Sequence, residues 1–307
     1  MRADTLILVN PAAGGGRALR AQPEIARFFS RSNHPVEFVR SQSTADLRRL
    51  AEEAATAGYR SIAALGGDGA FHHVVEATFG RDVILGFLPA GNGNDLAEAL
   101  RIPKDPIAAA SVFLKSRPRA IDVIRAKFSR DRAAIFLGAG GAGLDAEAAQ
   151  MANTRFRRWP RVTRYLAGAF TAFARSKSLT AEIEMEGDLG RVTFSGNILM
   201  AAVANSPWYG SGFRIAPEAE LDDGWMDIAV VREIPWTRLL EAIPILLRTG
   251  DLRWPEIQRH KARRMALRTN RPVLVHGDGE ILGETPVEFE ILPGAIRVIA
   301  PARHRHA

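Results

Sequence analysis

The sequence predicts an α/β domain with a parallel sheet, followed by a mainly β-sandwich domain with inserted helices. The 307 residues exceed the ~100–200 that are typical of one domain. The first third alternates strand-like and helix-like segments, whereas after about residue 118 short β-type runs take over. We therefore expect domains at residues 1–118 and 119–307, with the last strand able to return to the first domain.

Short apolar runs in the first third predict the strands of the parallel sheet, and a polar, mostly glycine-rich turn follows each of them. The runs cover residues 6–9, 36–40, 61–65 and 83–88. Apolar residues recur at helical spacing before the third run, at Leu47, Leu50, Ala51 and Ala54. Ligands in such folds bind at the carboxyl ends of the strands, so these turns are the first candidates for a site.

The remainder of the chain consists of β-type runs separated by turn residues, from "AIDVIRA" to "AIRVIA". Helical patterns interrupt these runs at residues 143–153, 162–174 and 236–249. A sandwich with inserted helices follows from this order of elements.

Composition restricts the partners. Lys plus Arg exceed Asp plus Glu by 41 to 34, a net charge of +7 that suits phosphates or an acidic lipid surface. We expect no nucleic acid, because no recognisable binding module accompanies the charge. The absence of cysteine excludes disulfides and thiolate metal sites. No apolar run suits a signal peptide or reaches the ~18–20 residues of a membrane span, which favours a cytoplasmic protein.

The turn "NPAAGGGR" after the first run has the composition of a phosphate cradle. Its glycines let backbone N–H groups approach an anion, and Arg17 and Arg20 offer positive charge. It lacks the GxxxxGK[ST] spacing of a Walker A loop, and a plain tight turn explains it equally well.

Asp68 follows the third run in "ALGGDGAFHHVVEATFG". It either caps the next helix or reaches a ligand phosphate through Mg²⁺, because a bare carboxylate would repel the phosphate. A second glycine turn, "GNGNDLAEAL", opens another helix after the fourth run and favours the magnesium interpretation. In that turn we expect Asn92 to contact the ligand and Asp95 to be structural.

The strings "NPAAGGG", "GGDGAFHHVVEA", "PAGNGNDLA", "LDDGWMD" and "HGDGE" together resemble the diacylglycerol/sphingosine-type lipid kinases, especially their soluble bacterial members. The match spans nearly the whole chain in the order of the family. It implies a nucleotide domain similar to those of NAD kinases and phosphofructokinases, then a β-sandwich, with ATP in the cleft between them. It also implies transfer of the γ-phosphoryl group to a lipid hydroxyl, with a diacylglycerol-like acceptor.

The resemblance assigns roles to residues by motif position. Glu280 would be the general base that takes the proton of the acceptor hydroxyl, with Asp278 beside it. A structural metal would be held by Asp223 and by backbone carbonyls near Glu220 and Trp225. The nucleotide phosphates and their Mg²⁺ would be held by Asn10, Gly14, Arg17, Ser41, Gly66, Gly67, Asp68, Gly69, Ala70, Gly91 and Asn92.

Each motif also has a plainer explanation, and one departs from the family. "HGDGE" alone is a hairpin turn, and "LDDG" is a common turn string. Family members usually have "GGDGT" and then asparagine and glutamate, whereas this chain has Ala70, His72 and His73. The backbone N–H of Ala70 remains for a phosphate. We expect the histidines to be helix-face residues rather than metal ligands, because adjacent residues on a helix point apart.

The segment "RFRRWPRVTRYLAGAFTAFARSK" suits an anionic bilayer surface, with Trp159 as an interfacial residue. Core packing explains its apolar stripe equally well, and for "WTRLLEAIPILLRTG" core packing is preferred. The stripe consists of Val162, Tyr165, Leu166, Ala169, Phe170 and Phe173. The flanking cations are Arg155, Arg157, Arg158, Arg161, Arg164, Arg175 and Lys177.

The sequence thus predicts an ATP- and Mg²⁺-dependent kinase that phosphorylates a lipid hydroxyl at a membrane surface. Peripheral contact with the inner face of the membrane and a homo-oligomer are both compatible with it. One alternative is a soluble-substrate kinase of the NAD kinase type. Another is a catalytically weak nucleotide- or lipid-binding regulator, which Ala70 favours and the retained Glu280 opposes.

Overall fold

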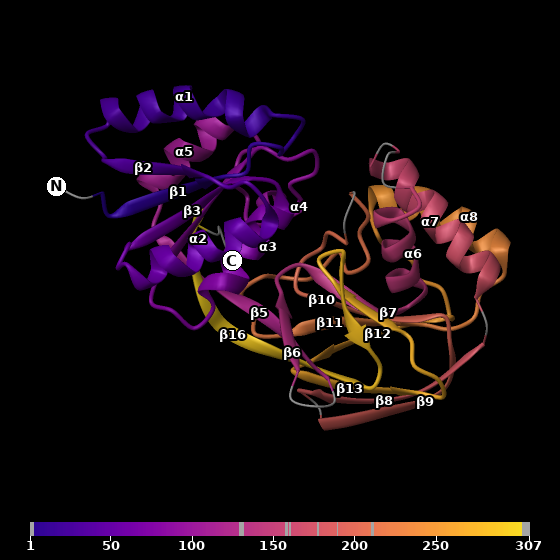
Figure 1. Cartoon of the computed structure of the whole chain (residues 1–307). Coiled ribbons are helices and arrows are strands. Elements are labelled where there is room, and N and C mark those ends of the chain that lie inside the picture. Colours follow the sequence, from indigo (N-terminus) through magenta and orange to yellow (C-terminus); the bar gives the residue numbers. More distant parts are fainter. Residues whose placement is uncertain are drawn as a thin grey trace. The chain divides into compact units, whose positions relative to one another are not determined.

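The computed structural model describes residues 3–128, 132–156, 159, 161–176, 178–188, 190–209 and 212–302. The chain forms two compact units (Figure 1), an α/β unit of Met1–Ile121 with Gly294–Ala307 and a mainly β unit of Asp122–Pro293. The predicted fold class is confirmed. Strand β16 (Val287–Ile299) starts in the second unit and ends in the first.

The first unit is built on a parallel sheet in the order β2-β1-β3-β4, which the end of β16 extends through Arg297 and Val298. All residues of β1 are buried, as are all but the first of β3 and β4. The strands are β1 (Thr5–Val9), β2 (Val36–Arg40), β3 (Ser61–Gly66) and β4 (Ile84–Pro89).

Helices cover both faces of this sheet, with α1 and α5 on one face and α2 and α3 on the other (Figure 1). Phe113 of α5 packs directly on Gly86 of β4. A Cβ at position 86 would lie 2.3 Å from the phenyl ring, so this contact requires glycine. Phe71 of α3 stacks on Phe87 of β4, with ring centroids 4.7 Å apart. The helices are α1 (Arg17–Arg31), α2 (Thr44–Thr56), α3 (Asp68–Thr78), α4 (Asp95–Ala99) and α5 (Pro106–Lys115).

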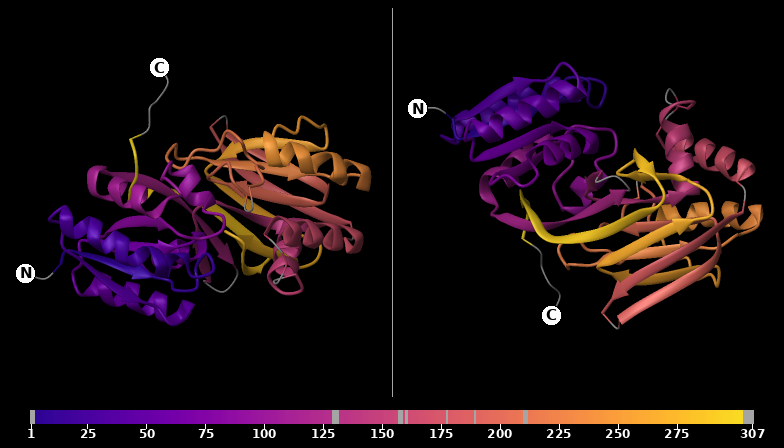
Figure 2. Two further views of the ribbon diagram at one scale, coloured as in Figure 1. Left: turned by 90° about the horizontal axis from the view of Figure 1, so that it is seen from above. Right: turned by 60° about the horizontal axis from the view of Figure 1, so that its bottom comes forward.

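The second unit is an antiparallel sandwich. Among its described residues, one sheet has the order β16-β13-β8-β9, with β5 paired to β16 and β6 paired to β5. The other sheet has the order β12-β11-β10-β7-β14-β15. Strands β8 and β9 form one edge of the first of these sheets (Figure 2, right). Buried side chains such as Met265, Phe289 and Ile228 fill the core.

The strands of this unit begin and end as follows, in chain order: β5 (Pro118–Phe128), β6 (Ala133–Phe136), β7 (Ala139–Gly143), β8 (Leu179–Gly187), β9 (Gly190–Ile198), β10 (Met200–Ala204), β11 (Met226–Val231), β12 (Ile257–Ala262), β13 (Arg264–Thr269), β14 (Leu274–Gly277) and β15 (Glu280–Glu284).

The inserted helices are α6 (Leu144–Asn153), α7 (Arg161–Arg175) and α8 (Trp236–Arg248), as the sequence predicts. They lie on one side of the sheets of this unit (Figure 1). Helices α6 and α7 approach closely because Gly168 lacks a side chain, and a Cβ there would lie 2.6 Å from the carbonyl oxygen of Ala148. No helix in the described part of the chain is both long and apolar enough to cross a bilayer.

Glu290 of β16 joins three strands of the sandwich through charged contacts. Its carboxylate lies 2.6 Å from the Arg125 guanidinium and 2.8 Å from the Lys127 ammonium, both on β5, and 3.1 Å from Arg264 of β13. Hydrogen bonds from Arg125 and Lys127 lower the pKa of Glu290 to about 2. A carboxyl group whose pKa is depressed by folding stabilises the fold above its unfolded pKa and loses this contribution on acidification.

We therefore predict that Glu290→Gln lowers the free energy of unfolding at pH 7 by about 1–2 kcal/mol, after allowance for solvent screening. The deficit should shrink as the pH falls from about 4.5 toward about 2, because the native carboxylate is then protonated as well. Urea unfolding at several pH values measures this. Glu288→Gln on the same strand is the matched control, since the Glu288 side chain is 44% exposed and makes only a longer ion pair, of 3.6 Å, with Lys127. A deficit that does not change with pH would contradict the prediction.

Candidate active site

The turns that follow β1, β3 and β4 meet at one edge of the parallel sheet. The N–H of Asn10 donates to the Leu65 carbonyl at 3.0 Å, and the N–H of Ala90 donates to the Gly66 carbonyl at 2.6 Å. Because parallel neighbours end at the same edge, the structure brings the glycine turns together where α/β folds bind ligands.

Glycines allow these turns to touch. Gly14 has φ +58°, and a Cβ there would lie 2.1 Å from the Ala90 carbonyl oxygen. A Cβ on Gly91 would lie 2.5 Å from the Cα of Gly67. The Arg17 guanidinium donates to the Gly91 carbonyl at 3.1 Å. Predicted nucleotide contacts from all three turns therefore belong to one packed group of residues.

Asp68 is a helix cap, but for a helix other than its own. Its carboxylate oxygens accept the N–H groups of Asp95 at 3.1 Å and of Leu96 at 3.0 Å, which are the first two residues of α4. The sequence argument considered only a cap of the helix that follows Asp68 directly. A carboxylate has about four acceptor directions, so two N–H contacts do not by themselves exclude a metal ligand.

The start of α3 suits an anion. The N-cap residue of this helix is Gly67, which has no side chain to cap it, and the first N–H groups of an α-helix have no partner within the helix. A Cβ on Gly69 would meet no atom within 4 Å, so the backbone there is open on that side. Ala70 is buried beside Gly66. The residues present therefore fit a phosphate group.

The other predicted nucleotide contacts lie around this edge. The Asn10 side chain accepts the N–H of Ala12, and the buried Ser41 hydroxyl donates to the Val9 carbonyl at 3.2 Å. Asn92 is exposed in its turn.

Sequence reasoning missed Asn94, which holds the turn after β4. It is buried at φ +62°, and its side chain makes two hydrogen bonds of 3.0 Å with the backbone of Gly91. An asparagine between a glycine turn and a helix was the available signal, because asparagine tolerates the left-handed conformation.

Glu280 begins β15, directly after a firmly held turn. Asp278, at φ +50°, accepts the N–H groups of Leu137 at 2.9 Å and Gly138 at 2.8 Å. The Asn153 amide donates to the Gly279 carbonyl at 2.8 Å. "HGDGE" is thus a hairpin turn, as its plainer explanation required. The Glu280 side chain is exposed.

A buried polar cluster that sequence reasoning missed lies next to this hairpin. The Asp145 carboxylate of α6 contacts the Tyr209 hydroxyl and lies 3.2 Å from His276 Nε2, and the Tyr209 hydroxyl lies 3.2 Å from the same nitrogen. Burial and the Asp145 charge raise the pKa of Tyr209 well above its usual value, so the hydroxyl keeps its proton. His276 precedes Asp278 by two residues, and the cluster therefore anchors the strand that leads to Glu280.

The predicted metal loop carries its own positive charge. Asp223 accepts the N–H of Trp225 at 2.9 Å, and its other oxygen lies 2.9 Å from the Lys261 ammonium. Lys261 also lies 3.6 Å from Asp227. A single ammonium thus lies beside two carboxylates, and a metal held by Asp223 and the nearby carbonyls of Glu220 and Trp225 would share Asp223 with Lys261.

The apolar stripe of α7 is divided between core and solvent. Ala169 and Phe173 pack against the buried cluster around Ala172, whereas Val162 and Phe170 are exposed. The cations Arg157, Arg158 and Lys177, and the side chain of Arg161, lie outside the described residues. Arg155 and Arg164 lie over the rings of Phe156 and Tyr165.

Helix α8 also exposes large apolar side chains, although the sequence favoured core packing for it. Trp236 is 63% exposed and Leu240 44%, and Leu247 is exposed as well. Only Ala242 of the described residues in this helix is fully buried. Trp159, which precedes α7, is 53% exposed.

Comparison with known protein families matches both units. Residues 4–126 match the diacylglycerol kinase catalytic domain, and residues 138–300 match the YegS C-terminal NAD kinase beta sandwich-like domain.

Similar proteins cover nearly the whole chain. A diacylglycerol kinase of Mycobacterium tuberculosis is 29% identical over 300 residues, which are 97% of this chain and 94% of the relative. A YegS-like lipid kinase of Pseudomonas aeruginosa is 29% identical over 84% of this chain and 82% of its own. The crystal structure of a diacylglycerol kinase from Bacillus anthracis shares the fold, with a TM-score of 0.75 at 20% identity over 97% of this chain and 96% of that one. The chain therefore belongs to the family of diacylglycerol kinase-type lipid kinases, and it is a lipid kinase.

Proposed function

We propose that this lipid kinase uses ATP with Mg²⁺ to phosphorylate the hydroxyl of a diacylglycerol-like lipid. The observation that carries the nucleotide part is the open start of α3, whose N-cap residue Gly67 has no side chain, among the packed glycine turns. The acceptor class rests on the names of the relatives, which include diacylglycerol kinases of Mycobacterium tuberculosis and Bacillus subtilis. In this proposal the unit that begins the chain binds the nucleotide and the sandwich receives the lipid.

The phosphates would accept N–H groups from the first turn of α3 and from the glycine turn after β1. Such donors, together with the partial positive charge of the helix start, are suited to the γ- and β-phosphates. Arg17, held against Gly91, adds a fixed positive charge at this edge. Asp68 would hold Mg²⁺, whose charge would neutralise phosphate oxygens during transfer.

Glu280 would act as general base on the acceptor. It would take the hydroxyl proton while the lipid oxygen forms a bond to the γ-phosphorus and the bond to the ADP oxygen breaks. Its exposure leaves the carboxylate accessible to a substrate. Asp278 would keep the turn rigid through the Leu137 and Gly138 N–H groups. No step is assigned to the loop of Asp223, whose carboxylate forms an ion pair with Lys261.

Ala70 supports a second candidate, a regulator that binds nucleotide without turnover. It lacks the hydroxyl that a threonine would offer to a phosphate. A soluble-substrate kinase is the third candidate, and both are outcomes that the first experiment below would detect.

The exposed apolar side chains of α7 and α8 support peripheral contact at the inner face of a membrane. Arg238 near the start of α8 and Arg248 at its end add positive charge to this helix. Apolar side chains beside cations bind an anionic lipid surface through burial and charge together.

We predict that purified protein transfers phosphate from ATP to diacylglycerol in mixed anionic vesicles, as measured with labelled ATP. Glu280→Gln should lower kcat by about 10²–10⁴-fold, because the proton acceptor is lost, and should leave ATP affinity unchanged. Glu284→Gln, at the other end of β15, is the matched control. Turnover on soluble alcohols alone, or nucleotide binding without turnover, would contradict the proposal in favour of the other candidates.

A second prediction concerns the membrane. Trp236→Ser combined with Leu240→Ser should weaken sedimentation with anionic vesicles by about tenfold or more, because each side chain would lose roughly 1.5–3 kcal/mol of apolar burial. ATP affinity should not change. Val192→Ser on β9, also an exposed apolar residue of this unit, controls for general hydrophobicity. Equal vesicle binding by the α8 variant and the control variant would exclude α8 as a membrane contact.

A further inference from the structure

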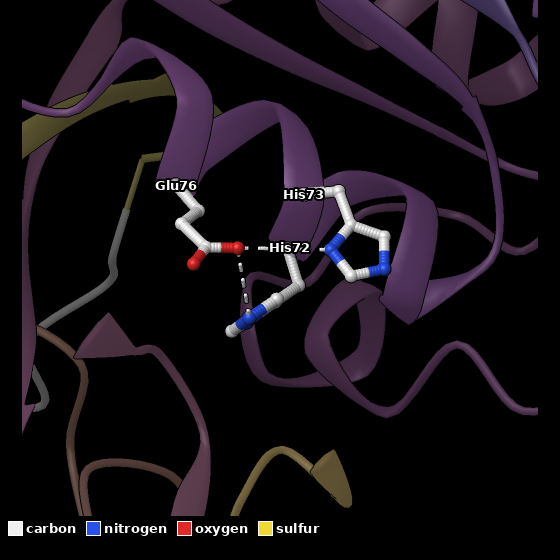
Figure 3. Close-up of side chains that lie close together, drawn as sticks. All are labelled: His72, His73 and Glu76. Carbon is white, nitrogen blue, oxygen red and sulfur yellow. Dashed lines mark ion pairs between the residues drawn. The ribbon is translucent and has the colours of Figure 1, made fainter. Parts of the chain in front are cut away.

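Helix α3 carries three metal-ligating side chains that converge on one point (Figure 3). His72 Nε2 lies 4.0 Å from Glu76 Oε2, and His73 Nδ1 lies 3.8 Å from the same oxygen. The three ligand atoms lie within 4.8 Å of one another. The expectation that adjacent histidines point apart fails here, because Glu76 follows them by four and three residues and so neighbours both along the helix. Both imidazoles are buried rather than on the open helix face.

We propose that His72, His73 and Glu76 form a binding site for a divalent transition-metal ion of the Zn²⁺ or Co²⁺ type. Two imidazole nitrogens and one carboxylate oxygen are a ligand set that such ions prefer. A tetrahedral ion with bonds of about 2.0–2.1 Å keeps its ligand atoms about 3.4 Å apart. The contacts of both histidines with Glu76 would need to shorten by about half an ångström, and the separation of the two histidine nitrogens, which is at most 4.8 Å, by up to about 1.4 Å.

A cation already occupies part of this site. The Arg48 guanidinium, from α2, lies 2.6 Å from Glu76 Oε2 and 3.1 Å from His73 Nδ1. The guanidinium therefore contacts two of the three ligand atoms that a metal would use. The Arg48 side chain is 44% exposed, so a metal can displace it into solvent at low cost.

The carboxylate oxygen that both histidines approach is buried. Within the described part of the chain Glu76 Oε2 makes no hydrogen bond, and the Arg48 guanidinium lies 2.6 Å from it as an ion-pair partner. A buried carboxylate needs a cation beside it to offset the cost of burial, and a metal ion at this position would supply one.

This site is distinct from the proposed magnesium position at Asp68. Mg²⁺ prefers an all-oxygen set, whereas two nitrogens select borderline ions. A bound ion would cross-link the second and third turns of the helix whose start we propose as the phosphate site. The inference does not depend on turnover, because binding can be measured without nucleotide or lipid.

The test titrates the full chain with Co²⁺, followed by visible absorption, and with Zn²⁺, followed by calorimetry. We expect about one ion per chain, with the spectrum of a histidine-ligated cobalt. His73→Gln and Glu76→Gln should each weaken binding by about tenfold or more. Arg48→Ala should tighten binding several-fold, because the competing cation is removed. Excess Mg²⁺ should not compete.

Other histidines provide the controls. His260→Gln and the double variant His304→Gln with His306→Gln should bind the ions as the unmodified chain does. Thermal melting checks that each variant folds, and if His73→Gln is destabilised, Glu76→Gln and Arg48→Ala decide. Binding that survives Glu76→Gln, or that disappears with the two C-terminal histidines, would assign the ion elsewhere and overturn the proposal. Unchanged or weaker affinity in Arg48→Ala would overturn it too.

Discussion

The first unit depends on one carboxylate that joins two turns. Asp68 stands at the start of α3 and accepts the N–H groups that open α4, so the ends of β3 and β4 keep a fixed spacing. The contact of Gly67 with Gly91 requires the same spacing. The Asp68 carboxylate thus serves α4, while the N-cap residue of α3 is Gly67, which has no side chain, and a Cβ on Gly69 would meet no atom within 4 Å.

The second unit repeats this arrangement in a different fold. Asp278 lies in a Gly-Asp-Gly string, as Asp68 does, and its carboxylate also accepts backbone N–H groups from a distant segment. Both aspartates fix a glycine turn by hydrogen bonds across the fold. Unlike Asp68, Asp278 is followed two residues later by an exposed carboxylate, that of Glu280. The buried cluster of Asp145, Tyr209 and His276 holds β14, the strand that leads to Asp278. Rigid turns of this kind suit a reaction that is catalysed mainly by holding the reacting groups in the correct geometry.

The helices and strands could be predicted from the sequence, whereas the hydrogen-bond partners of the site residues could not. Apolar runs predicted the inner strands β1, β3 and β4 because burial on both faces leaves a local signal. The partner of Asp68 lies 27 residues away, and the cluster at His276 joins residues from α6, a loop and β14, so neither has a local pattern. The exposure of Glu280 depends on which other segments pack over the hairpin, and tertiary packing of this kind leaves no local pattern in the sequence. His72 and His73 converge because Glu76 follows one turn later, a relation that comparison of adjacent residues missed.

The proposed nucleotide site depends on the open first turn of α3, and the ATP affinity of the Gly69→Ala variant tests it most directly. A Cβ at this position meets no atom within 4 Å, and alanine favours a helix over glycine by roughly 0.5–1 kcal/mol. The variant should therefore melt no lower than the unmodified chain, yet bind ATP with Mg²⁺ about tenfold more weakly, because the methyl group occupies the approach of a phosphate. Unchanged ATP affinity in the stably folded variant would contradict the central claim.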